Sequence, residues 1–429
     1  MSKLIKTTLE NICLNEKKSI ISGPFGSNIS SKFFISKGIP VIRGSNLSLS
    51  YKKFIENEFA FISKEKADEL NCYAYRKDII FTIAGTIGQV GIIPDDSKFT
   101  EYVISNKQAR VRINEKIVDN LYVYYWLSSP LIQDKLKNSN KGSTVPLLTL
   151  SEIKDIPIIY PIDNNLQKKI SNFLEGLSKK IELNNKINDN LEQQVKLLYD
   201  YWFSQFDFPD ENGKPYCSSG GKMVRNKQLK RNIPENWKVV PLSTVLKFKS
   251  GFSFSSDLYV SEGKHKLITI KNVQDSGINL KVDNYINDVP SNVPDYCFLE
   301  VNDILMSLTG NVGRIGIMYD SGCLLNQRVA LTKSLNEDLH SFVYFLLKSD
   351  IIRKQYEIIA NGSSQKNLSP LEAEDVLFAY NEQIAAQFSS VTNKHLKIIV
   401  SNLTENENLI HLREWLLPIL MNGQATIRD

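Results

Sequence analysis

The sequence predicts an α+β protein with two similar β-rich domains, each followed by a long α-helix, the two helices packing as an antiparallel coiled coil with pseudo-two-fold symmetry. A segment of the first half recurs in the second, the recurring segments are β-branched, and a long apolar stripe follows each copy. The expected order is a first domain (1–163), a helix (164–206), a linker (207–236), a second domain (237–380), a helix (381–421) and a tail (422–429).

The recurrence is clearest between residues 71–95 and 296–320, which match without gaps at a constant shift of 225. Identical pairs include Cys72/Cys297, Asp78/Asp303, Gly85/Gly310, Gly88/Gly313 and Gly91/Gly316. Residues 142–158 match 362–378 at a shift of 220, and the same shift places Asn106 opposite Asn326. This period is far longer than the roughly 20–50 residues of a solenoid repeat, so it indicates a duplicated domain.

Strands are indicated within each copy by glycine-bounded, β-branched runs such as KDIIFTIAG and NDILMSLTG. Short helices are expected at 117–137 and 337–358, where aromatic residues recur at three- and four-residue spacing. The G-x-x-G-x-x-G runs at Gly85–Gly91 and Gly310–Gly316 are interpreted as turns or tight strand crossings. A close backbone approach to a ligand is the alternative for these runs.

Each long helix is predicted from residues that recur every seven positions. The first row is Ile170, Leu177, Leu191 and Leu198, with Asn184 at the missing step. The second row is Ile384, Val391, Ile398, Leu412 and Ile419, with Glu405 at the missing step, and the stripe is widened by Phe388, Ile399, Leu403, Leu409, Leu416 and Leu417. Such a stripe is typical of a coiled-coil seam, on which a polar residue fixes the register at some cost in stability. The alternative is a helix pair that merely completes a domain core.

The composition points to a globular protein with 42% apolar and 23% charged residues. There is no apolar run of about 18 residues and no signal-peptide core, so neither a membrane span nor secretion is expected. Five cysteines without a C-x-x-C motif indicate reduced thiols and a cytoplasmic location. The net charge of +5 mildly favours an anionic partner.

The usual signatures of catalysis are missing from the sequence. The four histidines have no cysteine or aspartate at zinc-ligand spacing, and no phosphate-binding loop or nucleophile elbow occurs. The N-P-P-[FY] tetrapeptide of amino-methyltransferases is also missing. Residues 214–231 carry six basic and no acidic side chains. They are interpreted as a solvated linker, with a phosphate-contacting strip as the alternative.

The order of these parts resembles the specificity subunit of a Type I restriction–modification enzyme, and the resemblance covers essentially the whole chain. It rests on ISGPFGSNIS (21–30) and its echo KSGFSFSSDLY (249–259), together with the paired glycine runs. It rests also on the GST–LTLSEIKDIPI segment before the first helix, on YDYWFSQFDFP after it and on the C-terminal HLREWLLPILMNGQ.

The resemblance implies two target-recognition domains, each reading one half of a split double-stranded DNA site, with the long helices as a ruler between them. It implies two modification subunits that bring S-adenosylmethionine and methylate adenine, and restriction subunits that use ATP and Mg²⁺. This chain itself would then be non-catalytic and carry no cofactor or metal. The alternatives are a stand-alone DNA-binding regulator, a recognition chain of another restriction–modification type, and a nuclease.

Candidate DNA contacts are polar or basic residues expected on loops and strand ends of the repeated domain. In the first copy they are Ser22, Ser27, Asn28, Arg43, Asn46, Thr86, Lys107, Gln108, Lys141, Ser143 and Thr144. In the second copy they are Lys249, Ser253, Thr269, Lys271, Asn272, Asn311, Arg314, Gln327, Arg328, Gln365 and Lys366. For each, the alternative is a solvated turn or a local hydrogen bond.

Arg43 and Arg314 are preferred among these candidates, because arginine is the commonest bidentate reader of guanine. The two copies share their apolar pattern but carry different polar side chains at aligned loop positions, as in Thr86/Asn311, Gln89/Arg314 and Arg43/Thr269. We therefore expect an asymmetric bipartite target.

Overall fold

The computed structural model describes residues 3–48, 52–138, 147–362, 366–425 and 427. The chain forms two compact units. The first unit contains residues 1–183 together with 406–429, and the second contains residues 184–405. Each unit therefore combines one β-rich domain with part of each of two long helices.

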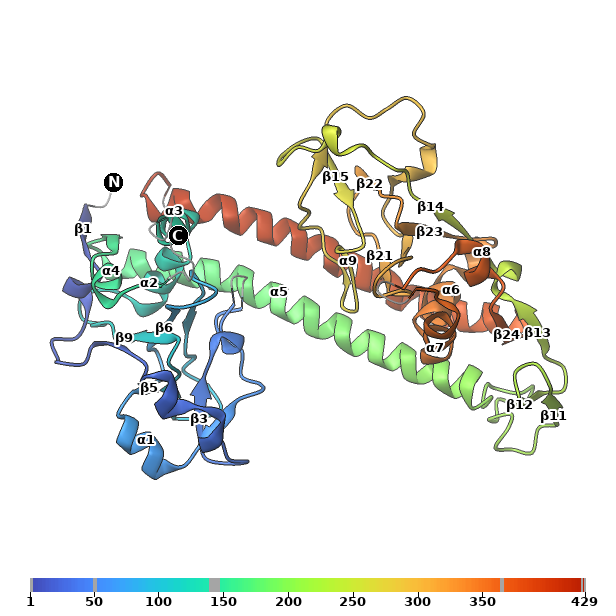
Figure 1. The fold of residues 1–429 in the computed structure, drawn as a ribbon, viewed down its shortest axis with the longest axis horizontal. Coiled ribbons are helices and arrows are strands. Elements are labelled where there is room, and N and C mark those ends of the chain that lie inside the picture. Colours follow the sequence, from blue (N-terminus) through green and yellow to red (C-terminus); the bar gives the residue numbers. More distant parts are fainter. Residues whose placement is uncertain (1–2, 49–51, 139–146, 363–365, 426, 428–429) are drawn as a thin grey trace. The chain divides into compact units, whose positions relative to one another are not determined.

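The first unit contains two four-stranded sheets (Figure 1). One is antiparallel, in the order β2 (Ile20–Ser22), β9 (Gln108–Val111), β6 (Ile79–Thr82) and β7 (Val90–Ile92). The other runs in the order β4 (Ala60–Ile62), β3 (Ile39–Ile42), β8 (Glu101–Ile104) and β5 (Tyr73–Tyr75), with β3 and β8 parallel. Along β6, Ile79 and Phe81 enter one core and Ile80 the other, as the two-residue period of a strand requires.

The second unit repeats both sheets in the same strand order. The antiparallel sheet is β14 (Leu246–Ser250), β23 (Val329–Ser334), β20 (Ile304–Ser307) and β21 (Ile315–Ile317). The mixed sheet is β18 (Tyr285–Ile286), β15 (His265–Ile268), β22 (Cys323–Leu325) and β19 (Phe298–Leu299), with β15 and β22 parallel. A hairpin of β16 (Val273–Gln274) and β17 (Gly277–Ile278) is added. The predicted duplication is therefore confirmed at the level of topology.

In both units, an antiparallel pair joins the start of the β-rich domain to its end. In the first unit β1 (Leu4–Thr8) pairs with β10 (Pro157–Pro161), and in the second β13 (Lys238–Pro241) pairs with β24 (Leu377–Tyr380). The next backbone hydrogen bond is also equivalent, because Leu9 donates to Ile156 and Leu242 donates to Val376.

The two units also share individual turn contacts. The Oδ2 atoms of Asp78 and Asp303 accept backbone N–H groups three residues earlier, at 2.9 and 2.8 Å. Lys77 and Asn302, which precede them, both adopt positive φ angles of 71° and 77°. The first two glycines of each run form a turn between paired strands, with φ angles of 89° at Gly85 and 73° at Gly310, and the third glycine lies in β7 or β21. Glycine tolerates such angles without steric cost, so the interpretation of these runs as turns is confirmed.

The short helices differ from the prediction, because each is broken in two. The helix expected at 117–137 is α2 (Asn120–Leu127) followed by α3 (Pro130–Asn138), and the one expected at 337–358 is α6 (His340–Lys348) followed by α7 (Asp350–Ile359). Pro130 has no N–H to continue α2, and the Ser349 hydroxyl accepts the Ile352 N–H at the start of α7. The remaining short helices are α1 (Lys64–Leu70), α4 (Leu150–Lys154) and α8 (Pro370–Glu374).

The predicted long helices are α5 (Asn164–Tyr199), which ends in a π-helical turn (Asp200–Ser204), and α9 (Glu382–Met421). In the second unit Asn184 donates to Glu405 at 2.7 Å, and Asn188 donates to the Ile399 carbonyl and accepts from Asn402. Along α5 the residue numbers increase while those of the hydrogen-bonded partners on α9 decrease, so the two helices are antiparallel there. In the first unit the start of α5 shares a core with the end of α9.

The buried stripe of α9 follows the predicted row only in part. Ile384 is buried, and so are Ile399 and Leu417, which were expected to widen the stripe, whereas Val391, Ile398 and Leu412 are exposed by 47%, 46% and 39%. A helix that packs against both another helix and its own domain buries a broad stripe, and the spacing alone does not say which of two adjacent rows faces inward.

The segment between the domains is more ordered than the predicted solvated linker. It contains the hairpin β11 (Met223–Asn226) and β12 (Arg231–Pro234). Phe208 stacks on Trp237 with ring centroids 5.2 Å apart, inside the core of the second unit. Among the basic residues of this segment, Lys222 pairs with Glu235 and the Arg231 guanidinium lies over the Phe206 ring.

Candidate nucleic-acid interface

A buried asparagine fixes the same turn after the third strand of each domain. The Asn46 Oδ1 accepts the Arg43 N–H at 3.0 Å, and its Nδ2 donates to the carbonyls of Ile55 and Asn57. Asn272 repeats this pattern, because its Oδ1 accepts the Thr269 N–H and its Nδ2 donates to the Asn279 and Lys281 carbonyls. These two predicted DNA contacts are thus used to hold the backbone beneath Arg43 and Thr269.

A close backbone contact fixes a second loop in each domain. Gly23 lies against Ser105 and Gly251 against Asn326, each so closely that a Cβ atom would meet the facing carbonyl oxygen. Ser105 and Asn326 donate their N–H groups to Ile42 and Ile268, which end equivalent strands. The structure therefore pairs Asn326 with Ser105, and the sequence alignment of Asn326 with Asn106 was wrong by one residue. Loop lengths on either side of this point differ, which is why spacing alone misplaced it.

In the first domain these loops enclose a groove of about 590 Å³, called here the first groove. Its lining is Arg43, Gly44, Ser45, Thr82, Ala84, Gly85, Thr86, Gln89, Ser105, Asn106, Lys107 and Gln108. Four of the predicted residues, Arg43, Thr86, Lys107 and Gln108, are therefore brought together. Thr86 and Lys107 are exposed, Arg43 is half-buried and Gln108 is fully buried.

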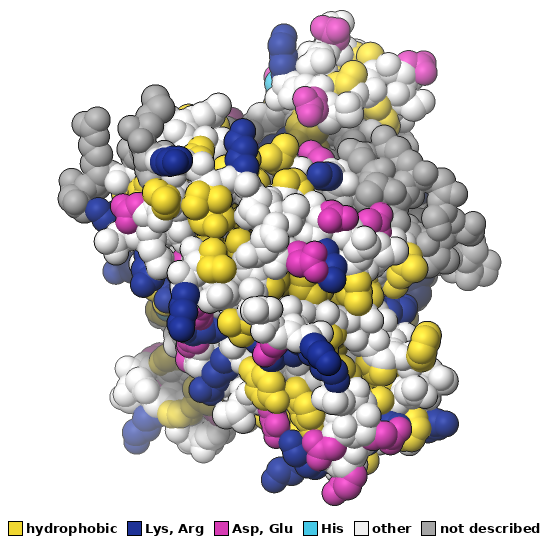
Figure 2. All heavy atoms as spheres, turned by 90° about the vertical axis from the view of Figure 1, so that its left-hand side faces the viewer, with side chains coloured by type: hydrophobic (Ala, Val, Ile, Leu, Met, Phe, Trp, Pro, Cys, Tyr) yellow, Lys and Arg dark blue, Asp and Glu magenta, His cyan; other side chains and the backbone are white. Residues whose placement is uncertain are grey.

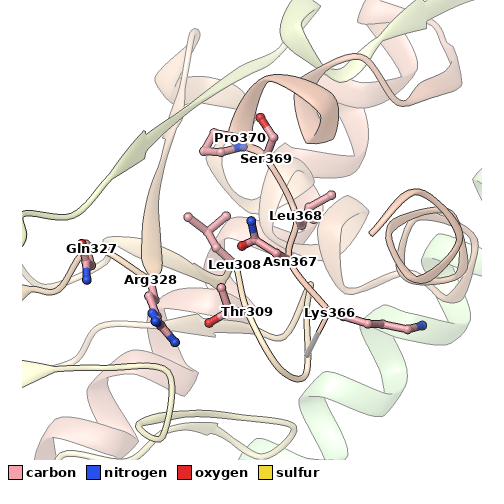
Figure 3. A pocket seen from close by; sticks show the side chains of 9 residues that line it. All are labelled: Leu308, Thr309, Gln327, Arg328, Lys366, Asn367, Leu368, Ser369 and Pro370. Atoms are coloured by element: carbon pink, nitrogen blue, oxygen red, sulfur yellow. The ribbon is translucent and has the colours of Figure 1, made fainter. Parts of the chain in front are cut away.

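The second domain has a groove of about 630 Å³, called here the second groove (Figure 3). Its lining is Leu308, Thr309, Gln327, Arg328, Lys366, Asn367, Leu368, Ser369 and Pro370. The predicted residues Gln327, Arg328 and Lys366 meet there. In Figure 3 the Lys366 side chain extends away from Arg328, and its Nζ donates to the Glu357 carbonyl at 3.0 Å.

The two preferred arginines are engaged by the protein. The Arg43 Nη2 donates to the Glu58 carbonyl at 2.7 Å. The Arg314 guanidinium pairs with Asp275 at 2.9 Å, and Asp275 also pairs with Arg353 at 3.0 Å. Reading a base with Arg314 would therefore require Asp275 to give up that ion pair. Gln89, aligned with Arg314, accepts from the Thr82 hydroxyl and donates to the Leu47 carbonyl.

The other predicted residues lie outside the groove linings. Ser22 ends β2, and Ser27 and Asn28 lie exposed in the short helix that follows it. In the second domain the Lys249 ammonium lies over the Tyr296 ring, and Ser253 and Asn311 are exposed. The hydrogen bond to Asp283 raises the pKa of Lys271 above its ordinary value. The predicted contacts Lys141, Ser143, Thr144 and Gln365 fall outside the described residues.

Both grooves contain polar residues that were not among the predicted contacts. They are Ser45, Thr82, Gln89, Ser105 and Asn106 in the first groove, and Thr309, Asn367 and Ser369 in the second. Comparison of the two copies had shown that Gln89 differs from Arg314, and the same comparison could have suggested Thr309, which differs from its counterpart Ala84. The remaining residues become neighbours only through strand pairing.

Charges on the face shown in Figure 2 are mixed, with Lys and Arg interspersed with Asp and Glu. In the described part of the chain, no three His, Cys, Asp or Glu side chains come together as metal ligands would. No helix among those residues is long and apolar enough to cross a membrane.

Comparison with protein families shows to which family this chain belongs. The family model for the Type I restriction modification DNA specificity domain matches residues 10–193 and 234–374, which is one match for each copy. The chain belongs to this family. Its relatives include the Type I restriction enzyme MjaIX specificity subunit of Methanocaldococcus jannaschii, which is 25% identical over 82% of this chain and 78% of the relative. The HindI specificity subunit of Haemophilus influenzae is 20% identical over 96% of this chain and 100% of the relative.

The fold of this family member is also that of a solved structure. The crystal structure of the Type-I restriction-modification system S subunit from M. genitalium matches with a TM-score of 0.53 at 15% identity, covering 98% of this chain and 96% of that one. The resemblance read from the sequence and the predicted α+β fold class are thereby confirmed.

Proposed function

We infer that this chain is the DNA-binding specificity subunit of a Type I restriction–modification system and that it recognises an asymmetric bipartite site. The observation that carries this inference is the pair of grooves, which share three equivalent positions (Ala84/Thr309, Asn106/Gln327 and Lys107/Arg328) in two copies of one scaffold but otherwise have different linings. An equal scaffold suits two equal DNA half-helices, and unequal linings suit two different half-sequences.

We propose that catalysis lies on partner subunits and that this chain is non-catalytic. Modification subunits would bring S-adenosylmethionine for adenine methylation, and restriction subunits would bring ATP and Mg²⁺. The assembly would act in the cytoplasm, where its DNA lies. No His, Cys, Asp or Glu is among the described residues that line the two grooves, and the basic and amide side chains there suit binding to DNA.

We propose that two modification subunits dock on the long helices. In the first unit, Phe173, Leu412 and Trp415 are exposed on these helices, by 40%, 39% and 64%. In the second unit, Leu197, Val391 and Ile398 are exposed by 70%, 47% and 46%. Several large apolar side chains exposed on helices that already have a buried face are typical of a protein-binding surface.

We propose further that the helices set the gap between half-sites. The 36 residues of α5 correspond to roughly 54 Å at 1.5 Å per residue. Insertion of about four residues, one helical turn, into α5 should lengthen the gap in the methylated motif without altering either half. An unchanged gap would refute this spacer role.

The experiment that tests the proposed function is methylome sequencing of a host carrying the complete system. We expect methylated adenines in an asymmetric motif of two short halves separated by an unread gap. Replacing residues 237–380 by the corresponding domain of a relative should change one half of the motif only. Loss or change of both halves would contradict the modular reading, and no methylation in a host with functional modification subunits would contradict the function.

A further inference from the structure

Lys107 and Arg328 occupy equivalent positions in the two domains. Ile83, one residue beyond β6, donates its N–H to the Lys107 carbonyl at 2.8 Å. Leu308, one residue beyond β20, donates its N–H to the Arg328 carbonyl at 3.0 Å, so the two positions are equivalent. The preceding loops are equivalent as well, since Gln108 and Val329 donate to the carbonyls of Ser105 and Asn326. Each domain therefore carries a cation at the same point of its groove.

These two cations are exposed, and they differ from the others nearby in having no side-chain partner among the residues that the structure describes. Neither the Lys107 ammonium nor the Arg328 guanidinium makes a hydrogen bond or ion pair with a residue that the structure describes, and both side chains line a groove. By contrast, Arg43 and Lys366 donate to backbone carbonyls and Arg314 pairs with Asp275. An unpaired exposed cation is free to meet an anion without losing an internal contact.

The buried side chains at the bottom of the grooves differ between the domains, whereas the cation is kept in both. Gln108 in the first groove corresponds to Val329 beside the second, and Thr309 in the second corresponds to Ala84 in the first. The Gln108 Nε2 and the Thr309 hydroxyl are buried and have no hydrogen-bond partner among the described residues. A buried donor without a partner is unfavourable, and a ligand that accepts its hydrogen bond removes that penalty.

We propose that Lys107 and Arg328 contact equivalent phosphates of the two half-sites, and that Gln108 and Thr309 help to distinguish the bases. The inference rests on the proposed function. Both half-sites have the same phosphate backbone but different bases. A charge kept in both copies therefore suits the constant part of the ligand, and a polar group present in one copy only suits the variable part.

The first test measures binding of the complete enzyme to two duplexes, one with the methylated motif and one with that motif scrambled. Salt is varied from about 50 to 200 mM, and each of Lys107→Ala and Arg328→Ala should lower the slope of log affinity against log salt by about 0.9. Both duplexes should lose affinity by the same factor, and the methylated motif should not change. Lys107→Arg and Arg328→Lys should retain the wild-type slope.

Matched controls come from the opposite ends of the same strands. Lys116 follows the far end of β9 and Lys333 lies near the far end of β23, and both are exposed. Lys116→Ala and Lys333→Ala should leave the slope unchanged. An unchanged slope in Lys107→Ala or Arg328→Ala would overturn the phosphate assignment, as would an altered motif. A wild-type enzyme that binds neither duplex would instead contradict the proposed function.

The second test exchanges the buried side chains at the bottom of the grooves. Gln108→Val and Thr309→Ala each install the residue of the other copy, so both variants should fold, which thermal unfolding checks. Each should lower discrimination at one base position of its own half-site by roughly tenfold or more and leave the other half unchanged. Folded variants with the wild-type motif would overturn the base-reading role of Gln108 and Thr309, while the salt slopes would still report on the cations.

Discussion

Alanine at Gly23 tests the close contact that holds the loop of the first groove. Its Cβ would lie 1.9 Å from the Ser105 carbonyl oxygen, whereas an ordinary contact is at least 3.4 Å. The facing atom belongs to the backbone, so the chain itself must move by about 1.5 Å, the difference between these distances. Overpacking of this kind costs about 1–3 kcal/mol of folding free energy. The movement also displaces Gln108, whose backbone N–H donates to the same Ser105 carbonyl and whose side chain lines the first groove.

The same substitution elsewhere in the chain gives graded expectations. At Gly251 the Cβ would lie 2.3 Å from the Asn326 carbonyl oxygen, so Gly251→Ala should be destabilising but less so than Gly23→Ala. At Gly176, within α5, nothing lies within 4 Å. Because alanine favours the helix more than glycine does, Gly176→Ala should stabilise the protein by roughly 0.5–1 kcal/mol.

Urea unfolding and motif-resolved methylation by the complete enzyme measure these effects. Gly23→Ala should unfold at a lower urea concentration than wild type and lose selectivity in one half-site, and Gly251→Ala should lose selectivity in the other half. The explanation would be refuted if Gly23→Ala unfolded at the same urea concentration as wild type. It would also be refuted if either variant lost selectivity equally in both half-sites.

Three further predictions concern the turn, the thiols and pH. Asn46→Ala removes three hydrogen bonds at about 0.5–1.5 kcal/mol each, so urea unfolding should show a loss of roughly 2–4 kcal/mol; a loss below about 1 kcal/mol would contradict the role of that turn. Cys217 is half-buried and the other four cysteines are buried, and burial raises the pKa of Cys72 to about 11. A thiol reagent should therefore label one cysteine quickly in the folded protein and five after unfolding, and several fast thiols would argue against this packing. Burial lowers the pKa of His340 below its ordinary value of 6.5, so the unfolded state takes up the proton first as pH falls. The free energy of unfolding should thus decrease as pH falls from about 7.5 to 5.5, and it should decrease less in His340→Gln than in wild type. Equal decreases in the two proteins would exclude His340 as the cause.

The duplication could be predicted from sequence because its repeated residues have backbone roles. Asp78 and Asp303 hold equivalent turns, and Gly85 and Gly310 adopt positive φ angles, so substitution is costly in both copies. The long helices were predictable in extent, because their apolar residues recur over about ten turns. The spacing placed Ile399 and Leu417 in the stripe, but it did not reveal that Val391, Ile398 and Leu412 are exposed, since two neighbouring apolar rows satisfy the same period.

The grooves could be predicted only in part. Lys107 and Gln108 lie next to each other in sequence, but Arg43 reaches them through the pairing of β3 with β8 and the turn that Asn46 holds. Which polar side chains remain free is decided by neighbours distant in sequence, as when Asp275 engages Arg314 or Glu58 engages Arg43. Composition and periodicity contain no information about such pairings, so the preference for the two arginines could not be checked from sequence.

The pairing of β1 with β10, and of β13 with β24, has a consequence for how such proteins diversify. Each β-rich domain begins and ends on neighbouring strands, so its two covalent connections to the rest of the chain lie at a single place, while its core packs on the long helices. A genetic crossover within both strands of a pair would deliver a whole new domain and leave the boundary hydrogen bonds intact. New target specificities could then be acquired one cassette at a time, without waiting for coordinated point mutations.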